Sequence, residues 1–288
     1  METQYFLIST SHLETKIWFQ DNNDYKAGMN LVAVAAYVCR IRILDFILMS
    51  NHVHFVVQSS MEEARRFIDY FKLLYSKYLH NKYGYDKYLR SNNSDIMEID
   101  PFGESLERAI AYVHMNCVAA NICVYPSQYL WGCGSLLFSQ SPGSLGTSLG
   151  TMSQRTQRKL LHSRISLPPH YQVLPEGYVS PESYIPVKDI EALFRTPKRL
   201  LFFLNNSSKA KNRLSEEAMP SFRDQVILAG VADLCHTLFR KSCLEELSIE
   251  EKTELLKQLR YRFSADIAQL SRVTGISYPE ACQLLDSF

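Results

Sequence analysis

Two histidines, His52 and His54, are separated by one apolar residue, Val53. Runs of Phe, Val, Leu and Ile at 40–49 and 52–58 predict two strands with a tight turn between them. Side chains two apart on a strand point to the same face, so both imidazoles would stand side by side. Imidazoles spaced in this way can ligate one divalent cation. The alternative is a pair of partly exposed strand histidines without a ligand.

A second candidate lies on a helix expected to begin near Ser105 and to run past Asn116. At about 100° per residue, Tyr112 and Asn116 are one turn apart and roughly 40° apart around the helix. A phenol and an amide could therefore project to the same point on a neighbouring sheet. The alternative is a boundary tyrosine and a C-terminal asparagine. The apolar stripe that should face the core comprises Leu106, Ile110, Val113 and Cys117.

The elements that would position these residues alternate between strands and helices. Residues 4–10 read as a strand, Asp24 can cap a helix over 25–39, and a capping box at 60–63 opens a helix to about residue 83. A weak strand is expected at 96–99. This order suits an α+β, ferredoxin-like antiparallel sheet with helices on one face, and the uncovered face would carry the histidines.

The chain divides into three expected parts. Residues 1–135 hold the sheet, residues 136–154 are a linker rich in Gly and Ser, and residues 155–288 are a mainly helical C-terminal domain. Residues 248–288 show the pattern of a helix-turn-helix, although a plain helical hairpin would look similar. Its candidate DNA contacts, at the turn and the start of the final helix, are Ser271, Ser277 and Tyr278.

A cluster of basic residues follows the linker. It could contact phosphates, and a solvated helix face is at least as good an explanation. Its members are Arg155, Arg158, Lys159 and Arg164.

Composition limits the class of protein. The 288 residues carry a net charge of +1, so any basic surface must be local. There is no apolar run of about 18 residues and no signal-peptide pattern at the N-terminus, so we expect no membrane partner. Seven cysteines without a Cys-x-x-Cys pair suggest reduced thiols in the cytoplasm and give no support to a zinc site.

Three segments together resemble the REP-associated tyrosine transposases, a family of single-tyrosine HUH transposases related to the smallest insertion-sequence transposases. Residues 48–54 (Leu-Met-Ser-Asn-His-Val-His) resemble the HUH motif of histidine, hydrophobic residue and histidine. Residues 112–120 resemble the tyrosine helix, and residues 125–131 resemble the Pro-x-x-Tyr-x-Trp segment that follows it. The family's Asn-Pro-Val-Arg-Ala-Gly is here Asn-Cys-Val-Ala-Ala-Asn at 116–121, so an arginine is missing. The resemblance covers about residues 1–135.

The resemblance implies a transposase that cuts and rejoins single-stranded or hairpin DNA. Tyr112 would be the nucleophile, forming a 5′-phosphotyrosine and releasing a 3′-OH. His52, His54 and Asn116 would ligate Mg²⁺ or Mn²⁺. Hairpins in palindromic repeats are the implied substrate. Whether the protein acts as a monomer or as a homodimer stays open.

Three alternatives remain at this point. The chain could be a domesticated DNA-binding protein of the same fold without transposition activity. It could be an RNA-binding ferredoxin-like module, although the RRM aromatic motif is absent from its strands. It could be a metal-dependent hydrolase in which water attacks and Tyr112 is structural.

Overall fold

The computed structural model describes residues 4–10, 17–85, 89, 94–139, 146–207, 224–263, 265 and 267–286. The strands are β1 (Tyr5–Ser9), β2 (Arg42–Leu48), β3 (Val53–Gln58), β4 (Asp95–Ile99), β5 (Thr147–Ser148) and β6 (Gln172–Val173). The helices are α1 (Asn22–Cys39), α2 (Met61–Tyr83), α3 (Ser105–His114), α4 (Asn116–Ala119), α5 (Gln154–Leu161), α6 (Val187–Phe194), α7 (Pro197–Asn205), α9 (Asp224–Phe239), α10 (Ile249–Phe263), α11 (Ile267–Thr274) and α12 (Tyr278–Asp286).

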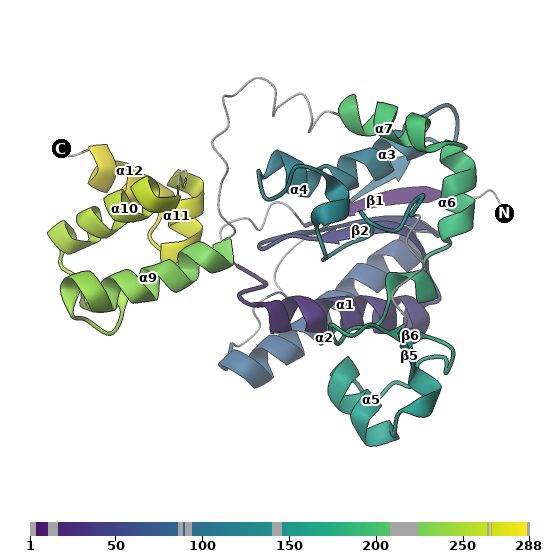
Figure 1. Cartoon of the computed structure of the whole chain (residues 1–288), viewed down its shortest axis with the longest axis horizontal. Coiled ribbons are helices and arrows are strands. Elements are labelled where there is room, and N and C mark those ends of the chain that lie inside the picture. Colours follow the sequence, from purple (N-terminus) through teal and green to yellow (C-terminus); the bar gives the residue numbers. More distant parts are fainter. Residues whose placement is uncertain are drawn as a thin grey trace.

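A four-stranded antiparallel sheet in the order β2–β3–β1–β4 is the scaffold of the fold (Figure 1). The β2–β3 hairpin closes where the amide of Met49 donates to the carbonyl of His52 at 2.8 Å. β1 pairs with both β3 and β4, so the N-terminal strand lies inside the sheet. The α+β class and the strand predictions, including the weak strand at 96–99, are confirmed.

Helices cover both faces of this sheet, which corrects the expectation of helices on one face. On one side α1 and α2 pack together, and the buried ring of Phe55 contacts Phe67 and Phe71 of α2. On the other side α3 packs against β2 and β3 (Figure 1). The ring of His54 on this face meets the ring of Tyr112 of α3. Neighbouring strand residues point to opposite faces. The histidine face is therefore covered by α3 and is not the open surface that the sequence predicts.

Two capping boxes set the starts of the long helices. In α1 the cap is Asp21, whose carboxylate accepts from the amide of Asp24 at 2.9 Å. Asp24 accepts in turn from the amide of Asp21 at 3.3 Å, so the helix begins at Asn22 rather than after Asp24 as predicted. In α2, Ser60 and Glu63 form the box that the sequence predicts.

The helix that carries Tyr112 ends at His114, and α4 begins at Asn116. The prediction of one continuous helix past Asn116 is therefore wrong, because the helix is interrupted at Met115. The reason is local. The side-chain amide of Asn116 donates to the carbonyls of Tyr112 and Val113 at 2.9 and 3.2 Å, so it competes with backbone amides for these acceptors.

Three hydrophobic clusters show which segments pack together. The largest joins the sheet and α1–α3 to α6 and α7, and another joins α5 to α1. The last joins α9–α12 to Ile17, in the segment before α1. From β1 to α7 the chain therefore packs around the sheet, and this part is the sheet unit. The predicted division instead separates residues 1–135 from residues 155–288. Of the predicted linker at 136–154, residues 140–145 lie outside the described residues, and Leu149 is fully buried.

Helices α9–α12 form a bundle beside the sheet unit (Figure 1). α10, α11 and α12 lie where the sequence predicts them, with Gly275 in a left-handed conformation (φ 73°) at the turn between the last two. α9 packs on α10 and α11 and lies outside the predicted helix-turn-helix. Among the described residues, no helix has the length and apolarity needed to span a membrane.

Candidate active site

The two histidines meet at the start of β3. His54 is in the strand and only 1% exposed, while the half-buried His52 lies in the turn immediately before it. Their ring centroids are 4.9 Å apart and the ring planes meet at 79°. The structure therefore brings the pair together, although His52 reaches this position from the turn and not from the strand.

Asn51 fixes the orientation of the His52 ring. The side-chain oxygen of Asn51 lies 2.8 Å from Nδ1 of His52. An amide oxygen accepts and cannot donate, so Nδ1 is the donor in this contact, and in the neutral ring the lone pair then belongs to Nε2. Metal-binding histidines commonly hold their second nitrogen on such an acceptor. Asn51 lies in the tight turn between the two predicted strands, and the sequence pattern does not reveal its contact with His52.

Tyr112 completes a cluster of three rings drawn from the turn, β3 and α3. Its ring meets that of His54 edge to face, with centroids 5.5 Å apart and planes at 80°. Tyr112 is half-buried, so part of its side chain reaches solvent beside the fully buried His54. Tyr112 thus lies beside His54, and His54 lies beside His52.

Asn116 lies one turn after Tyr112 and is 4% exposed. Because its amide nitrogen donates to the carbonyls of Tyr112 and Val113, the side-chain oxygen is the atom left for a ligand. Among the described residues, no three His, Cys, Asp or Glu side chains gather as a metal site. Two imidazoles and one amide oxygen would suit a borderline divalent ion such as Mn²⁺ better than Mg²⁺, which prefers oxygen ligands.

The C-terminal bundle holds the turn that carries His52. The hydroxyl of Ser50 donates to Oδ2 of Asp224, in α9, at 2.6 Å. Asp224 is 3% exposed and also accepts from the Gln269 amide at 2.8 Å and from the Arg272 guanidinium at 3.2 and 3.3 Å. Ser50 and Asp224 are 174 residues apart, so no local pattern in the sequence could reveal this contact.

The segment at 125–131 braces the strand that leads into the same turn. The Tyr129 hydroxyl donates to the carbonyl of Leu48 at 2.7 Å, and the amide of Leu48 donates to the carbonyl of Trp131 at 2.8 Å. Trp131 stacks on Tyr25 of α1 with centroids 4.9 Å apart. In this chain the segment that resembles Pro-x-x-Tyr-x-Trp therefore fixes the end of β2.

His114, two residues after Tyr112, faces the sheet. Its Nε2 lies 3.1 Å from Oδ1 of Asp45 in β2, and both side chains are buried. Burial raises the pKa of Asp45 above its usual value, because a carboxylate loses hydration there, and the nearby His114 and Cys133 offset this only in part. His114 is thus engaged below α3 and does not point to the Tyr112 hydroxyl as a general base.

The predicted DNA contacts lie in the C-terminal bundle and not in the ring cluster. The Ser271 hydroxyl donates to the carbonyl of Ile276 at 2.6 Å, and Ser277 caps α12 by accepting from the amide of Glu280 at 3.3 Å. Both hydroxyls therefore stabilise the turn between α11 and α12. Tyr278 is 54% exposed at the start of α12 and remains a candidate contact.

Comparison with known proteins finds a distant structural likeness and no matching family. No family and no curated protein matches this chain. The chain is similar to the solved structure of a REP-associated tyrosine transposase bound to a REP hairpin, with 11% identity and a TM-score of 0.31. The match covers 46% of this chain and 75% of that chain. A likeness at this level carries no argument about activity. The class defined here is an α+β fold on a four-stranded antiparallel sheet.

Proposed function

We propose that this protein is a metal-dependent single-stranded DNA endonuclease and strand transferase, a transposase that acts on hairpin-forming DNA. One observation carries the proposal. The rings of His52, His54 and Tyr112 form a continuous cluster at the junction of the turn, β3 and α3. The same three residues lie in the segments that resemble the HUH motif and the tyrosine helix of REP-associated tyrosine transposases.

His52 and His54, with the side-chain oxygen of Asn116, are the residues that would hold Mg²⁺ or Mn²⁺. When bound, the ion would polarise the scissile phosphate and offset negative charge in the transition state. The hydrogen bond from His52 Nδ1 to Asn51 supports this assignment, since it leaves Nε2 as a ligand atom.

Tyr112 would act as the nucleophile. Its hydroxyl oxygen bonds to phosphorus, the P–O3′ bond breaks, the phenolic proton is lost and the strand leaves with a 3′-OH. The phosphotyrosine preserves the phosphodiester bond energy, so a 3′-OH can later attack it and rejoin strands. The edge contact with His54 would hold the Tyr112 ring during the attack.

The experiment is incubation with Mn²⁺ and a labelled single-stranded hairpin, followed by a denaturing gel and mass spectrometry of the adduct. We expect a covalent adduct on Tyr112 that is absent from Tyr112→Phe and from the His52→Ala, His54→Ala double variant. Tyr261→Phe is the matched control, because Tyr261 is 88% exposed in α10, and it should retain the adduct.

Other outcomes would select other functions. Cleavage that survives Tyr112→Phe would indicate a hydrolase in which water attacks. Hairpin binding without cleavage or adduct would indicate a domesticated DNA-binding protein. RNA binding of the RRM type is disfavoured, because such modules stack bases on an open sheet face and here α3 covers the face that bears His54.

A further inference from the structure

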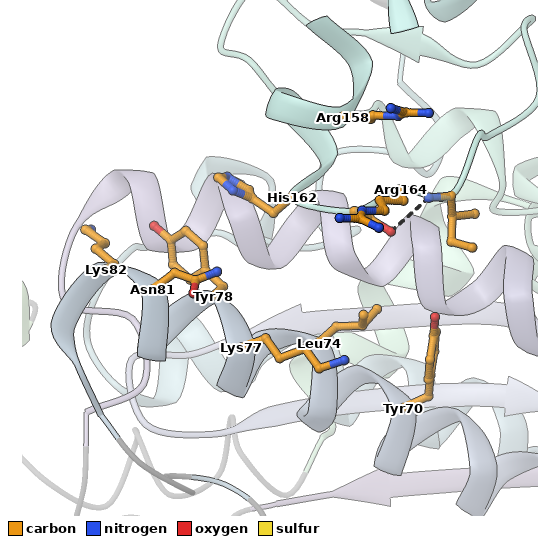
Figure 2. Close-up of a pocket in the computed structure, with 11 residues that line it drawn as sticks. Tyr70, Leu74, Lys77, Tyr78, Asn81, Lys82, Arg158, His162 and Arg164 are labelled. Atoms are coloured by element: carbon orange, nitrogen blue, oxygen red, sulfur yellow. Dashed lines mark hydrogen bonds between the residues drawn. The ribbon is translucent and has the colours of Figure 1, made fainter. Parts of the chain in front are cut away.

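A groove of about 1050 Å³ runs between α2 and the segment that ends α5 (Figure 2). α2 supplies Tyr70, Leu74 and Lys77, and the opposite wall includes Arg158 and Arg164. α2 packs on the sheet face opposite α3, so the groove lies away from the Tyr112 cluster. None of the residues that line the groove therefore takes part in the proposed cleavage chemistry.

The lining of the groove is positively charged. It includes four lysine and arginine side chains and no aspartate or glutamate. Lys82 is offset by Asp21 and Asp24, each 2.6 Å away. Lys77, Arg158 and Arg164 are exposed, and none of the ion pairs formed among the described residues involves them. In the part of the chain that the structure describes, three cations without an ion-pair partner thus line one groove.

The walls of the groove are held in place by the core. The buried Asn30 of α1 donates to the carbonyl of Leu160 at 3.0 Å and accepts from the amide of Val179 at 2.9 Å. Leu161 is fully buried, and Leu74 packs against the cores on both sides of the groove. The backbone that carries these cations is therefore packed against the core.

His162 adds a polar group without charge. Its ring meets Tyr78 edge to face at 4.8 Å. Partial desolvation and the nearby Lys82 lower the pKa of His162 below its usual value, which favours the neutral ring near pH 7. The charge of the groove near pH 7 therefore comes from Lys77, Arg158 and Arg164.

We infer that this groove binds the phosphodiester backbone of single-stranded DNA. Spread cations in an open groove suit an extended polyanion, and guanidinium groups match phosphate oxygens with paired N–H donors. The choice of DNA rests on the proposed function. A DNA strand bound both here and at Tyr112 would pass around the sheet unit. The groove would then increase the affinity for DNA without contacting the reacting atoms.

The test compares two double variants of equal charge from the same segment. Arg158→Gln, Arg164→Gln removes two groove cations, and Arg155→Gln, Lys159→Gln removes two exposed cations that do not line the groove. The probe is fluorescein-labelled oligothymidylate of about 30 nucleotides, longer than the site sizes of about 4–16 nucleotides typical of single-strand-binding folds. Anisotropy is measured without metal, in the Tyr112→Phe background.

We expect the groove variant to bind roughly 25-fold more weakly at about 0.1 M salt, since each lost phosphate contact removes about 0.7 from the slope of log K against log salt. Lys77→Gln should lose roughly fivefold on the same basis. The control variant should bind almost as the parent does. Thermal melting checks that every variant is folded.

Equal losses in both double variants would overturn the inference, because binding would then depend on the net charge of the segment and not on the groove. Absence of oligonucleotide binding by the parent would do the same. Displacement by inorganic phosphate, beyond the effect of chloride at equal ionic strength, would indicate a small-anion site instead. Failure to form a Tyr112 adduct leaves this test unaffected, because no cleavage is measured.

Discussion

The contact between Ser50 and Asp224 predicts that the C-terminal bundle stabilises the turn that carries His52. Ser50→Ala removes one buried hydrogen bond to a carboxylate, which should lower the free energy of unfolding by about 1.5–3 kcal/mol. Asp224→Asn leaves the guanidinium of Arg272 without its charge partner, and breaking such a buried pair costs about 3–5 kcal/mol. In the double variant the two losses should not add, with a coupling energy of about 1 kcal/mol or more.

The assay is urea unfolding followed by two probes. Both tryptophans, Trp18 and Trp131, lie in the core of the sheet unit, so their fluorescence reports that unit, while far-UV circular dichroism also reports the C-terminal bundle. In Asp224→Asn we expect the urea midpoints reported by fluorescence and by circular dichroism to differ, because the bundle loses a contact that holds it on the sheet unit. Asp233→Asn, at an exposed site in the same helix, should change neither.

Two results would refute this reasoning. One is a coupling energy within about 0.3 kcal/mol of zero, which would show that Ser50 and Asp224 act independently. The other is an Asp224→Asn variant as stable as Asp233→Asn. If the coupling is found, Ser50→Ala should also lower the yield of the Tyr112 adduct while hairpin binding is retained, because the turn would no longer hold His52 in place.

Three further outcomes follow from the structure. Gly132→Ala should lower the melting temperature by several degrees, since the added Cβ would lie 2.6 Å from the carbonyl oxygen of Phe46; an unchanged melting curve would contradict the close approach. Asn30→Ala should cost about 1–3 kcal/mol in urea unfolding, because it leaves a buried amide and carbonyl unpaired. Burial tends to raise the pKa of Asp21, but bonds from Lys82 and backbone amides hold it below its usual value. Stability from Asp21 is therefore present above about pH 4 and lost as the pH falls through the lower, folded-state pKa. Lys82→Gln should flatten this acid limb of a melting-temperature profile, and an unchanged limb would refute the assignment.

The elements of this protein could be predicted because their causes are local. Short apolar runs define β2 and β3, and the Ser60 box starts α2. The His52 and His54 pair needs only a short extended segment, so its proximity also follows from the sequence. The short sequence separation between Tyr112 and Asn116 likewise keeps them close, although they belong to consecutive helices, α3 and α4.

The predicted start of α1 and the predicted end of α3 were wrong because polar side chains there compete for the same hydrogen bonds. Asp21 takes the cap that Asp24 could have provided, because only Asp21 can accept from the third helical amide while its own amide is bound in return. Asn116 ends α3 early because its side chain takes carbonyls from the helix. Both choices depend on reciprocal hydrogen bonds that spacing alone does not reveal.

Which elements pack against one another is determined only by the tertiary structure. Packing places α3 over the face that the sequence left open, and so brings Tyr112 to His54. It carries Asp224 to Ser50 across 174 residues and sets Lys77 opposite Arg158 in one groove. Side-chain periodicity states which face of an element is apolar, but not which partner will cover it. That partner is selected by burial of the whole core, and the site and the basic groove result from this selection.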